Sequence, residues 1–428
     1  MQTQELRNSI IALINREVVP AIGCTEPAAV SLCVAKATEL LGTVPESIEL
    51  NLSGNIIKNA MGVGIPGTGM IGLPIAVALG AIIGKSEYGL EVLRDVCPEA
   101  VVRGKEYIET HHIAILHKED APSNLHIDVT VRAENHKARA VISRSHTNFI
   151  HLESDENILH TEACGADEET AGEEDIRLDM STVYDFAMTA PLEEIRFILK
   201  AKEMNTAAAM TALEGGYGHS LGSTIRTAGT KYFGDTPIEH IMAYTSAACD
   251  ARMGGAPVAV MSNSGSGNQG ITATMPVVSF ATDCHASEEQ TVRALILSHL
   301  TSIYIKQSLG RLSALCGCVV ASTGASAALV YLMGGGYSEV CAAVKNMVAN
   351  LTGMICDGAK PSCSMKIASG VSTAMMSVML AVNGKCVSSA EGIVCDDIDT
   401  TVHNLTSIGR EAMQETDRLV LKIMTCKH

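Results

Sequence analysis

The segment Leu125–Ser145, LHIDVTVRAENHKARAVISRS, carries the clearest structural signal in the sequence. Apolar and polar residues alternate through Leu125–Arg132 and again through Ala138–Ser145, and this period of two is typical of half-buried strands. The turn residues Glu134-Asn-His lie between the two runs. The sequence therefore predicts a small antiparallel sheet. Three further runs have strand character: Glu46–Leu52, Tyr107–Leu116 and Phe149–Leu152.

Helical spacing of apolar residues dominates on both sides of this sheet. Gln4–Val19 and Glu26–Leu41 precede it, and from about Met180 the pattern is helical almost to the end. We expect an α+β fold, with an N-terminal α/β part over residues 1–180 and a mostly helical domain over residues 181–428. The helices expected in that domain are Leu192–Leu213, Pro237–Met253, Thr272–Thr282, Glu288–Gln307, Gly310–Leu332, Glu339–Leu351, Ile367–Val382 and Thr400–Met424.

The composition limits what the core and the partners can be. Of the 428 residues, 47% are apolar but only 3% are aromatic, with 37 Gly, 20 Met and 14 Cys, which predicts closely packed helices with small side chains. The net charge of -16 argues against nucleic acid as a partner. Much of the acidity falls in the run from Glu153 to Asp175, which we interpret as a solvated linker rather than a metal site.

The chain shows neither a secretory leader nor a membrane span by sequence pattern. Its first residues lack a basic start followed by an apolar run. The longest apolar stretch, Met70 to Gly84, is shorter than the roughly 20 residues that cross a bilayer. We expect a cytoplasmic protein without a membrane partner, whose cysteines are free thiols, and a homodimer is compatible with its apolar helices.

Cys24 is the first candidate for chemistry. It lies in Ala21-Ile-Gly-Cys-Thr-Glu-Pro, directly before a helix that is expected to begin at Thr25 or Glu26. The positive end of a helix dipole favours a thiolate, which can act as a base, a nucleophile or a metal ligand. The alternative is a buried structural cysteine at a turn.

Two glycine-rich segments are candidates for binding a substrate anion. Ser262 to Gly270 is a polar loop that leads into a helix, and its backbone N–H groups can surround a carboxylate. The segment lacks the Gly-Lys-Ser/Thr of a phosphate loop, and the alternative is a flexible connection. The second segment, Ser53 to Pro74, is too rich in glycine for a regular element. The candidate binding residues are Gly67, Thr68, Ser264, Gly265, Asn268 and Gln269.

Four cysteines of the helical region are candidate metal ligands. Cys316 and Cys318 are separated by one glycine, and Cys356 and Cys363 flank a non-helical turn. The chain contains no Cys-x-x-Cys pair, so a zinc ribbon is disfavoured. Three thiolates would leave one iron of a [4Fe–4S] cluster open to substrate. The alternative is that these cysteines only pack between helices.

Four motifs in this order resemble the L-cysteine desulfidase family, which is similar to the iron–sulfur L-serine dehydratases. They are Gly23-Cys-Thr-Glu-Pro-Ala, Ser262-Asn-Ser-Gly-Ser-Gly-Asn-Gln-Gly, Gly310-Arg-Leu-Ser-Ala-Leu-Cys-Gly-Cys and Asn350-Leu-Thr-Gly-Met-Ile-Cys-Asp-Gly-Ala-Lys-Pro-Ser-Cys.

The resemblance implies a [4Fe–4S] enzyme that converts the small amino acid L-cysteine to pyruvate, ammonia and hydrogen sulfide without pyridoxal phosphate. It implies that Cys24 is the proton acceptor and that Cys356 and Cys363 are cluster ligands. The third ligand is then Cys318, with Cys316 as the alternative.

Three other functions remain open from the sequence. L-serine would present a hydroxyl to the same iron, so a serine dehydratase fits the same motifs. A cysteine-nucleophile hydrolase would use Cys24 with His219, and its activity would survive chelation and air. A non-enzymatic redox or cysteine sensor would bind a cluster or cysteine without forming pyruvate.

Overall fold

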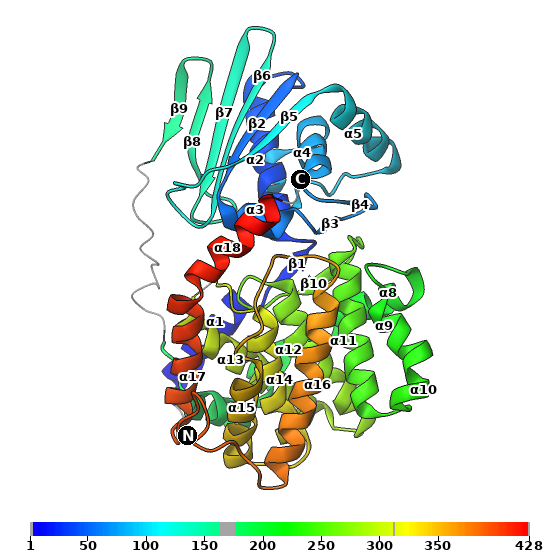
Figure 1. Ribbon diagram of the computed structural model, residues 1–428, viewed down its shortest axis with the longest axis vertical. Helices are drawn as coiled ribbons and strands as arrows, with labels where there is room; N and C mark the ends of the chain where they lie inside the picture. The colour runs from blue at the N-terminus through cyan, green and yellow to red at the C-terminus, as the bar shows by residue number, and fades with distance from the viewer. Residues whose placement is uncertain (1–2, 163–175, 311–312, 427–428) are drawn as a thin grey trace.

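The fold consists of a sheet layer with its covering helices and a helical body below it (Figure 1). The structure is a computed structural model and describes residues 3–162, 176–310 and 313–426. Its sheet and its helical region confirm the expected α+β class.

The sheet has six strands in the order β5-β2-β6-β7-β8-β9. The central strands β6 and β7 form the predicted hairpin, in which Val129 lies opposite Ala140. All neighbours are antiparallel except β2 and β5, which are parallel, so the expectation of a purely antiparallel sheet is wrong at this edge. The strands are β2 (Ser47–Leu52), β5 (His112–His117), β6 (His126–Ala133), β7 (His136–Ser143), β8 (Phe149–Ser154) and β9 (Asn157–Thr161).

A missed helix explains the parallel edge. The predicted strand Tyr107–Leu116 begins too early, because residues 98–110 form helix α5 (Pro98–Thr110), the last helix in the connection from β2 to β5. Buried Ala100, Gly104 and Tyr107 follow helical spacing. Two other helices pack with α5 against the sheet layer (Figure 1): α2 (Thr25–Leu41) and α4 (Leu73–Ile82).

The acidic run is not a loop at its start. Residues up to Thr161 form the β8–β9 hairpin, where Glu153 pairs with Lys137 at 3.0 Å and Asp155 with His136 at 2.9 Å. The expected linker is therefore wrong for this part. The rest of the run, residues 163–175, lies outside the described residues.

The helical body is built around buried helices that approach closely. A Cβ on Gly324 of α14 would overlap Ser302 Oγ and Ser298 O of α13, so only glycine permits this spacing. The prediction of tightly packed small residues is met here. The main helices of the body are α8 (Leu199–Gly215), α11 (Pro237–Met253), α12 (Gly267–Asp283), α13 (Glu288–Leu309), α14 (Gly317–Leu332), α15 (Tyr337–Leu351), α16 (Cys363–Val382) and α17 (Ile398–Ser407).

One helix boundary pair matches the prediction, and others differ where the helical structure is interrupted. Pro237–Met253 is matched to the residue, but α14 begins seven residues after the expected Gly310. Thr400–Met424 is not one helix, because a π-helical segment at Ile408–Ala412 separates α17 from α18 (Gln414–Thr425). The hydrophobic pattern continues through these breaks and therefore did not reveal them.

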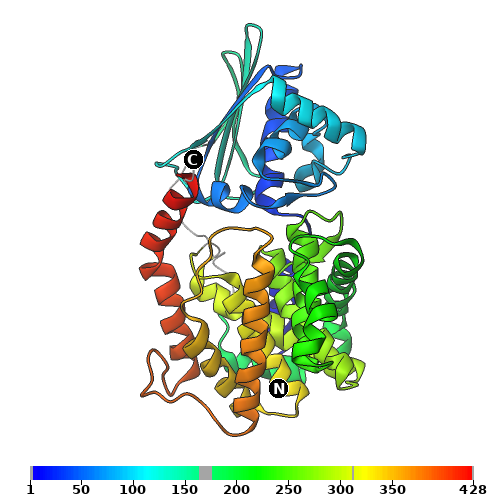
Figure 2. The same cartoon turned by 45° about the vertical axis from the view of Figure 1, so that its right-hand side comes forward.

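Both ends of the chain connect the sheet layer with the helical body. These connections cross the domain boundary that the sequence predicts at residue 180. Helix α1 (Gln4–Glu17) places Ile10 and Ile14 in the core of the helical body. Helix α18 rises from the helical body to the sheet layer (Figure 2), where Leu421 packs against the core of that layer. A short antiparallel pair, β1 (Pro20–Ile22) with β10 (Ala259–Met261), adds a third link. The division at residue 180 stays a prediction.

One helix, α16, is long and apolar enough to cross a membrane by length and composition. Half of its apolar window is buried, and its neighbours are α11, α14 and α15. A core helix of a globular protein has the same character, so α16 carries no argument for a membrane. The longest apolar segment by this criterion is therefore α16 and not the expected Met70–Gly84.

The ion pair between Lys58 and Asp417 fastens α18 to the sheet layer. Lys58 is only 3% exposed, so Asp417→Ala would leave a buried ammonium without its partner, at a cost of about 3 kcal/mol. We expect the urea midpoint of unfolding to fall accordingly. The matched control is Glu415→Ala on the same helix, whose pair with Arg418 is exposed and should matter little. Equal effects of the two variants would contradict the role of Lys58–Asp417.

Candidate active site

A cavity lies between the sheet layer and the helical body. Its walls come from the start of α2, from α3 (Gly54–Ala60), from the loop before α12 and from the first turns of α14 and α16. Most of the residues singled out from the sequence line it, although they are scattered over more than 330 positions. These are Cys24, Ser264, Gly265, Asn268, Gln269, Cys316, Cys318, Cys356 and Cys363.

Four helices begin at this cavity. Their N-cap residues are Cys24 for α2, Ser266 for α12, Cys316 for α14 and Ser362 for α16. Only Ser266 accepts a hydrogen bond from its own helix, and the other three cap side chains accept none. The first N–H groups of a helix and its dipole both attract negative charge. The positive ends of four helix dipoles therefore meet at one cavity.

Cys316 and Cys356 are brought together by backbone pairing. Cys316 N–H donates to Met354 O at 3.0 Å, and Cys356 N–H donates to Ala314 O at 2.6 Å. The Cys316 thiol then donates to the Cys356 sulfur. This hydrogen bond lowers the pKa of Cys356 and raises that of Cys316, so the pair shares one proton.

Cys318 and Cys363 occupy the first turns of the neighbouring helices α14 and α16. The Cys318 thiol donates to Lys366 O at 3.1 Å, and the Cys363 thiol donates to Gly358 O at 3.6 Å. Burial raises the pKa of Cys318 to about 12 and raises the pKa of Cys363 as well. Both sulfurs are protonated thiols in this state, and a bound metal would have to displace their protons.

The spacing of the sulfurs bears on the kind of metal group they fit. Among the described residues, no three of these thiols have ligand atoms within 4.8 Å of one another. Four ligands of a tetrahedral zinc would lie only about 3.8 Å apart, given Zn–S bonds of about 2.3 Å. A multi-iron cluster binds its cysteines through different irons and so spaces them more widely. The four cysteines therefore offer an all-sulfur donor set, the kind that iron–sulfur clusters use.

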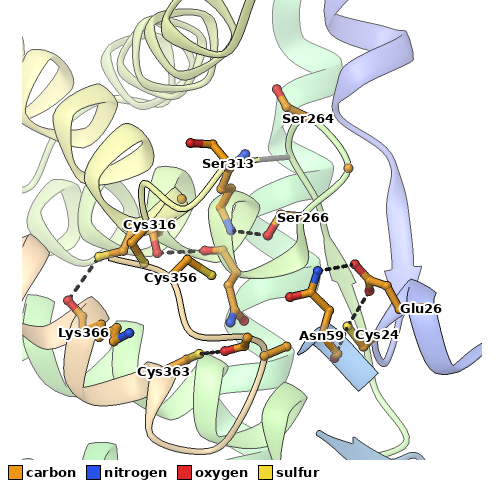
Figure 3. A pocket seen from close by; sticks show the side chains of 18 of the residues that line it. Cys24, Glu26, Asn59, Ser264, Ser266, Ser313, Cys316, Cys356, Cys363 and Lys366 are labelled. Atoms are coloured by element: carbon orange, nitrogen blue, oxygen red, sulfur yellow. Dashed lines mark hydrogen bonds between the residues drawn. The ribbon is translucent and has the colours of Figure 1, made fainter. Parts of the chain in front are cut away.

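Cys24 lies on the opposite wall from these cysteines (Figure 3). Its thiol donates to Glu26 Oε2 at 2.9 Å, while Asn59 Nδ2 donates to Glu26 Oε1 at 3.2 Å. Burial and the adjacent carboxylate raise the pKa of Cys24 far above its usual value, and Arg252 offsets this only in part. The expected thiolate is therefore wrong for the ligand-free chain: the helix dipole is outweighed by burial and by Glu26.

The loop before α12 forms the third wall. Ser264 and Gly265 adopt φ values of 48° and 78°, which turn the loop back on itself. Gln269 Nε2 donates to Asn263 O at 3.0 Å, so this amide holds the loop rather than facing a ligand. Asn268 Oδ1 accepts a hydrogen bond from Arg252 Nη1 at 3.1 Å. The predicted binding loop therefore lines the cavity. However, the side-chain amide of Gln269 donates its hydrogen bond to the loop itself.

Gly67, Thr68 and His219 are not brought to this cavity. Gly67 and Thr68 form the turn between β3 (Gly64–Ile65) and β4 (Met70–Ile71), where Thr68 Oγ1 donates to Ile65 O at 2.7 Å. The density of glycines that suggested a binding loop instead serves this tight turn, in which Gly67 has a φ of 75°. The structure gives the predicted substrate role of Gly67 and Thr68 no support.

Several cavity residues were missed from the sequence. Glu26 stands in the same motif as Cys24, and the proximity alone could have pointed to it. Arg252 ends a predicted helix and Lys58 lies in a glycine-rich segment, and neither has a local signal. Cys249 is buried beside the site, where its thiol donates to Asn268 Oδ1 at 3.7 Å. Tertiary structure alone brings these groups together.

The pairing of Cys24 with Glu26 is testable through alkylation. The raised pKa keeps Cys24 as a thiol below that pKa, so its rate of reaction with iodoacetamide should still climb with pH up to pH 9, without levelling off. Glu26→Gln removes the negative charge and should accelerate the reaction at any fixed pH in this range. Mass spectrometry of the Cys24 peptide measures the rate, with exposed Cys97 as an internal reference. An unchanged or slower rate in Glu26→Gln would contradict the pairing.

Comparison with known proteins identifies the family of the chain. Residues 87–422 match the family model described as serine dehydratase alpha chain. A protein named UPF0597 protein from Bacteroides thetaiotaomicron is 60% identical over 424 residues, covering 98% of each chain. Proteins of the same name from Porphyromonas gingivalis and Oleidesulfovibrio alaskensis are 53% and 46% identical, covering 98% and 97% of each chain. The chain therefore belongs to the serine dehydratase alpha chain family, which confirms the kinship with serine dehydratases expected from its four motifs.

Proposed function

We propose that the protein is a lyase that converts L-cysteine to pyruvate, ammonia and hydrogen sulfide by β-elimination, with a [4Fe–4S] cluster as its cofactor. One observation carries the proposal: Cys318 lines the same cavity in which Cys316, Cys356 and Cys363 lie on one wall and Cys24 on the other (Figure 3). Membership in the serine dehydratase family supports the lyase class, and the choice of L-cysteine comes from the resemblance of the motifs.

Cys356, Cys363 and one cysteine of the 316/318 pair are the proposed ligands. Cys318 is the proposed third ligand and Cys316 is the alternative: the Cys316 thiol donates to the Cys356 sulfur, and the Cys318 thiol donates to the carbonyl of Lys366. Lys366 and Lys360 hold Asp357 beside the ligand Cys356 and hold the pKa of this carboxyl at about 2 against the effect of burial. When bound, the cluster supplies an open iron that acts as a Lewis acid on the leaving group.

Cys24 is the proposed acceptor of the α-proton. Its position at the cavity wall opposite the proposed ligands places a substrate between them, so that the α-carbon and the leaving group face different groups. The C–H electron pair forms the double bond as the sulfur leaves Cβ, and the resulting aminoacrylate hydrolyses to pyruvate and ammonia. Because the resting thiol holds its proton, that proton must pass to solvent water when substrate binds, which leaves the Cys24 thiolate to accept the α-proton.

L-serine dehydration is the second candidate, and the family match favours it. The family is described by serine dehydratase, and the relatives' names state no substrate. The same residues serve both reactions, because only the leaving atom on Cβ differs.

The reaction and the cofactor can be tested together. Anaerobically purified protein should contain about four iron and four sulfide per chain and should form pyruvate from L-cysteine. The ratio of kcat/KM for L-cysteine and L-serine decides between the two substrates. Protein that stays free of iron after reconstitution would refute the proposal. Iron without pyruvate from either amino acid would favour the sensor, and pyruvate that survives chelation and air would favour a cluster-free enzyme.

Single-cysteine variants separate ligands from the proton acceptor. Cys356→Ser and Cys363→Ser should each abolish iron binding, and Cys318→Ser should lower the iron content more than Cys316→Ser if Cys318 is the third ligand. Cys24→Ala should retain iron and lose at least about 100-fold in kcat, the scale of a general base. The matched control is Cys33→Ala, a buried cysteine in the same helix as Cys24 but outside the cavity. Loss of iron in Cys24→Ala would instead make Cys24 a ligand.

A further inference from the structure

Arg252 is a buried cation in an unusual position. Its side chain is only 5% exposed and lies over the first residue of α12, so closely that a Cβ on Gly267 would collide with its guanidinium. Its Nε donates to Gly23 O at 3.1 Å and its Nη1 donates to Asn268 Oδ1 at 3.1 Å. Across the described part of the chain, no carboxylate pairs with it. A buried positive charge beside positive helix ends is unfavourable unless an anion joins it.

Glu26 is the complementary charge. It is the only carboxylate among the cavity-lining residues that the structure describes, and its neighbours Cys24, Thr25 and Asn59 all donate hydrogen bonds to it. Burial opposes ionisation, yet His146, the Cys24 thiol and Arg252 hold the pKa of Glu26 below its usual value. Glu26 is therefore an anion at neutral pH.

The two charges flank one residue. Arg252 binds the carbonyl of Gly23, the residue before Cys24, and Glu26 accepts the Cys24 thiol. We propose that Arg252 and Glu26 form a zwitterion clamp, in which Arg252 binds the α-carboxylate and Glu26 binds the α-ammonium of a small amino acid over Cys24. This rests on the proposed function, since it assigns the substrate groups of the same site.

The other cations of the cavity are committed elsewhere. Lys58 pairs with Asp417, and Lys366 pairs with Asp357. Lys306 Nζ donates to Gly310 O at 2.8 Å and lies on the helical body rather than beside Cys24. Arg252 is thus the cavity cation that lies beside Cys24, its hydrogen-bond acceptors are neutral, and its planar guanidinium suits a carboxylate better than an ammonium would.

The clamp also links binding to chemistry. In the ligand-free chain the negative charge of Glu26 raises the pKa of Cys24. An ammonium bound to Glu26 offsets this charge, so occupation of the clamp lowers the pKa of Cys24 toward the range in which it can accept the α-proton. Arg252 already acts on the pKa of Cys24 in this same direction. The amino group would then be needed for turnover as well as for affinity.

Non-reacting ligands test the clamp without any turnover. L-alanine carries both charged groups but no leaving group, propionate lacks the ammonium and ethylamine lacks the carboxylate. Calorimetric titration of anaerobically purified protein should show L-alanine binding about 10- to 100-fold more tightly than either single-charge probe, the scale of a charged hydrogen bond. Equal binding of propionate and L-alanine, or no binding of L-alanine, would overturn the proposal.

Variants of similar shape test which residue binds which charged group of the amino acid. Arg252→Gln should weaken L-alanine about 10- to 100-fold and leave ethylamine unchanged, and Glu26→Gln should weaken L-alanine similarly and leave propionate unchanged. Arg252→Lys should recover part of the affinity, which a purely structural arginine would not show. The matched controls Arg196→Gln and Glu288→Gln alter an exposed ion pair of the same kind and should leave L-alanine binding unchanged.

The failures of the two proposals are distinguishable. If the protein forms no pyruvate from L-cysteine or L-serine but the probes bind in the predicted pattern, the elimination is refuted and the clamp stands. If pyruvate forms but Arg252→Gln and Glu26→Gln keep the wild-type affinity for L-alanine, the clamp is refuted and the elimination stands. The wild-type comparison of the three probes decides the matter even if a variant does not fold.

Discussion

The convergence of four helix N-termini on one cavity is the constraint on which the rest of the site depends. Three of these helices begin without a side-chain cap, although the first three N–H groups of α16 donate to the backbone carbonyls of residues 360–362. This arrangement attracts negative charge, and the residues at the helix starts are those that can carry it: Cys24, Cys316 and Cys363. The packing of the helical body brings these starts together, since α14 packs against both α12 and α16.

Burial and the helix dipoles have opposite effects on the pKa values of the cavity thiols. The helix dipole alone favours thiolates, and this argument holds for exposed cysteines. Inside the cavity, the loss of water favours the neutral thiol and raises the pKa of Cys24, Cys318 and Cys363. Only Cys356, which accepts a hydrogen bond from Cys316, is shifted toward the thiolate. The ligand-free site therefore holds protons that binding of metal or substrate would release.

Elements whose apolar residues keep one spacing along the chain were predictable from the sequence. Elements at which this spacing changes were not. The hairpin of β6 and β7 and the helix Pro237–Met253 follow from alternation and helical spacing. Helix α5 was missed because Tyr107 fits both an amphipathic helix and the start of a strand. Helix α14 begins after its predicted start because the preceding segment pairs with residues 354–356. Such pairing depends on a partner 40 positions away, which no local pattern reports.

The sequence by itself determined the α+β class, the family and the cysteines that merit attention, because these depend on residue types, their local spacing and motifs in a fixed order. Only the tertiary structure decided that Cys24 faces the other four cysteines across one cavity, that Gly67 and Thr68 lie elsewhere, and that Arg252 and Glu26 flank Cys24. The physical reason is that charge complementarity and proton affinity depend on distance and burial. Arg252 and Glu26 are 226 positions apart in the chain and become neighbours of one thiol only when the helices pack.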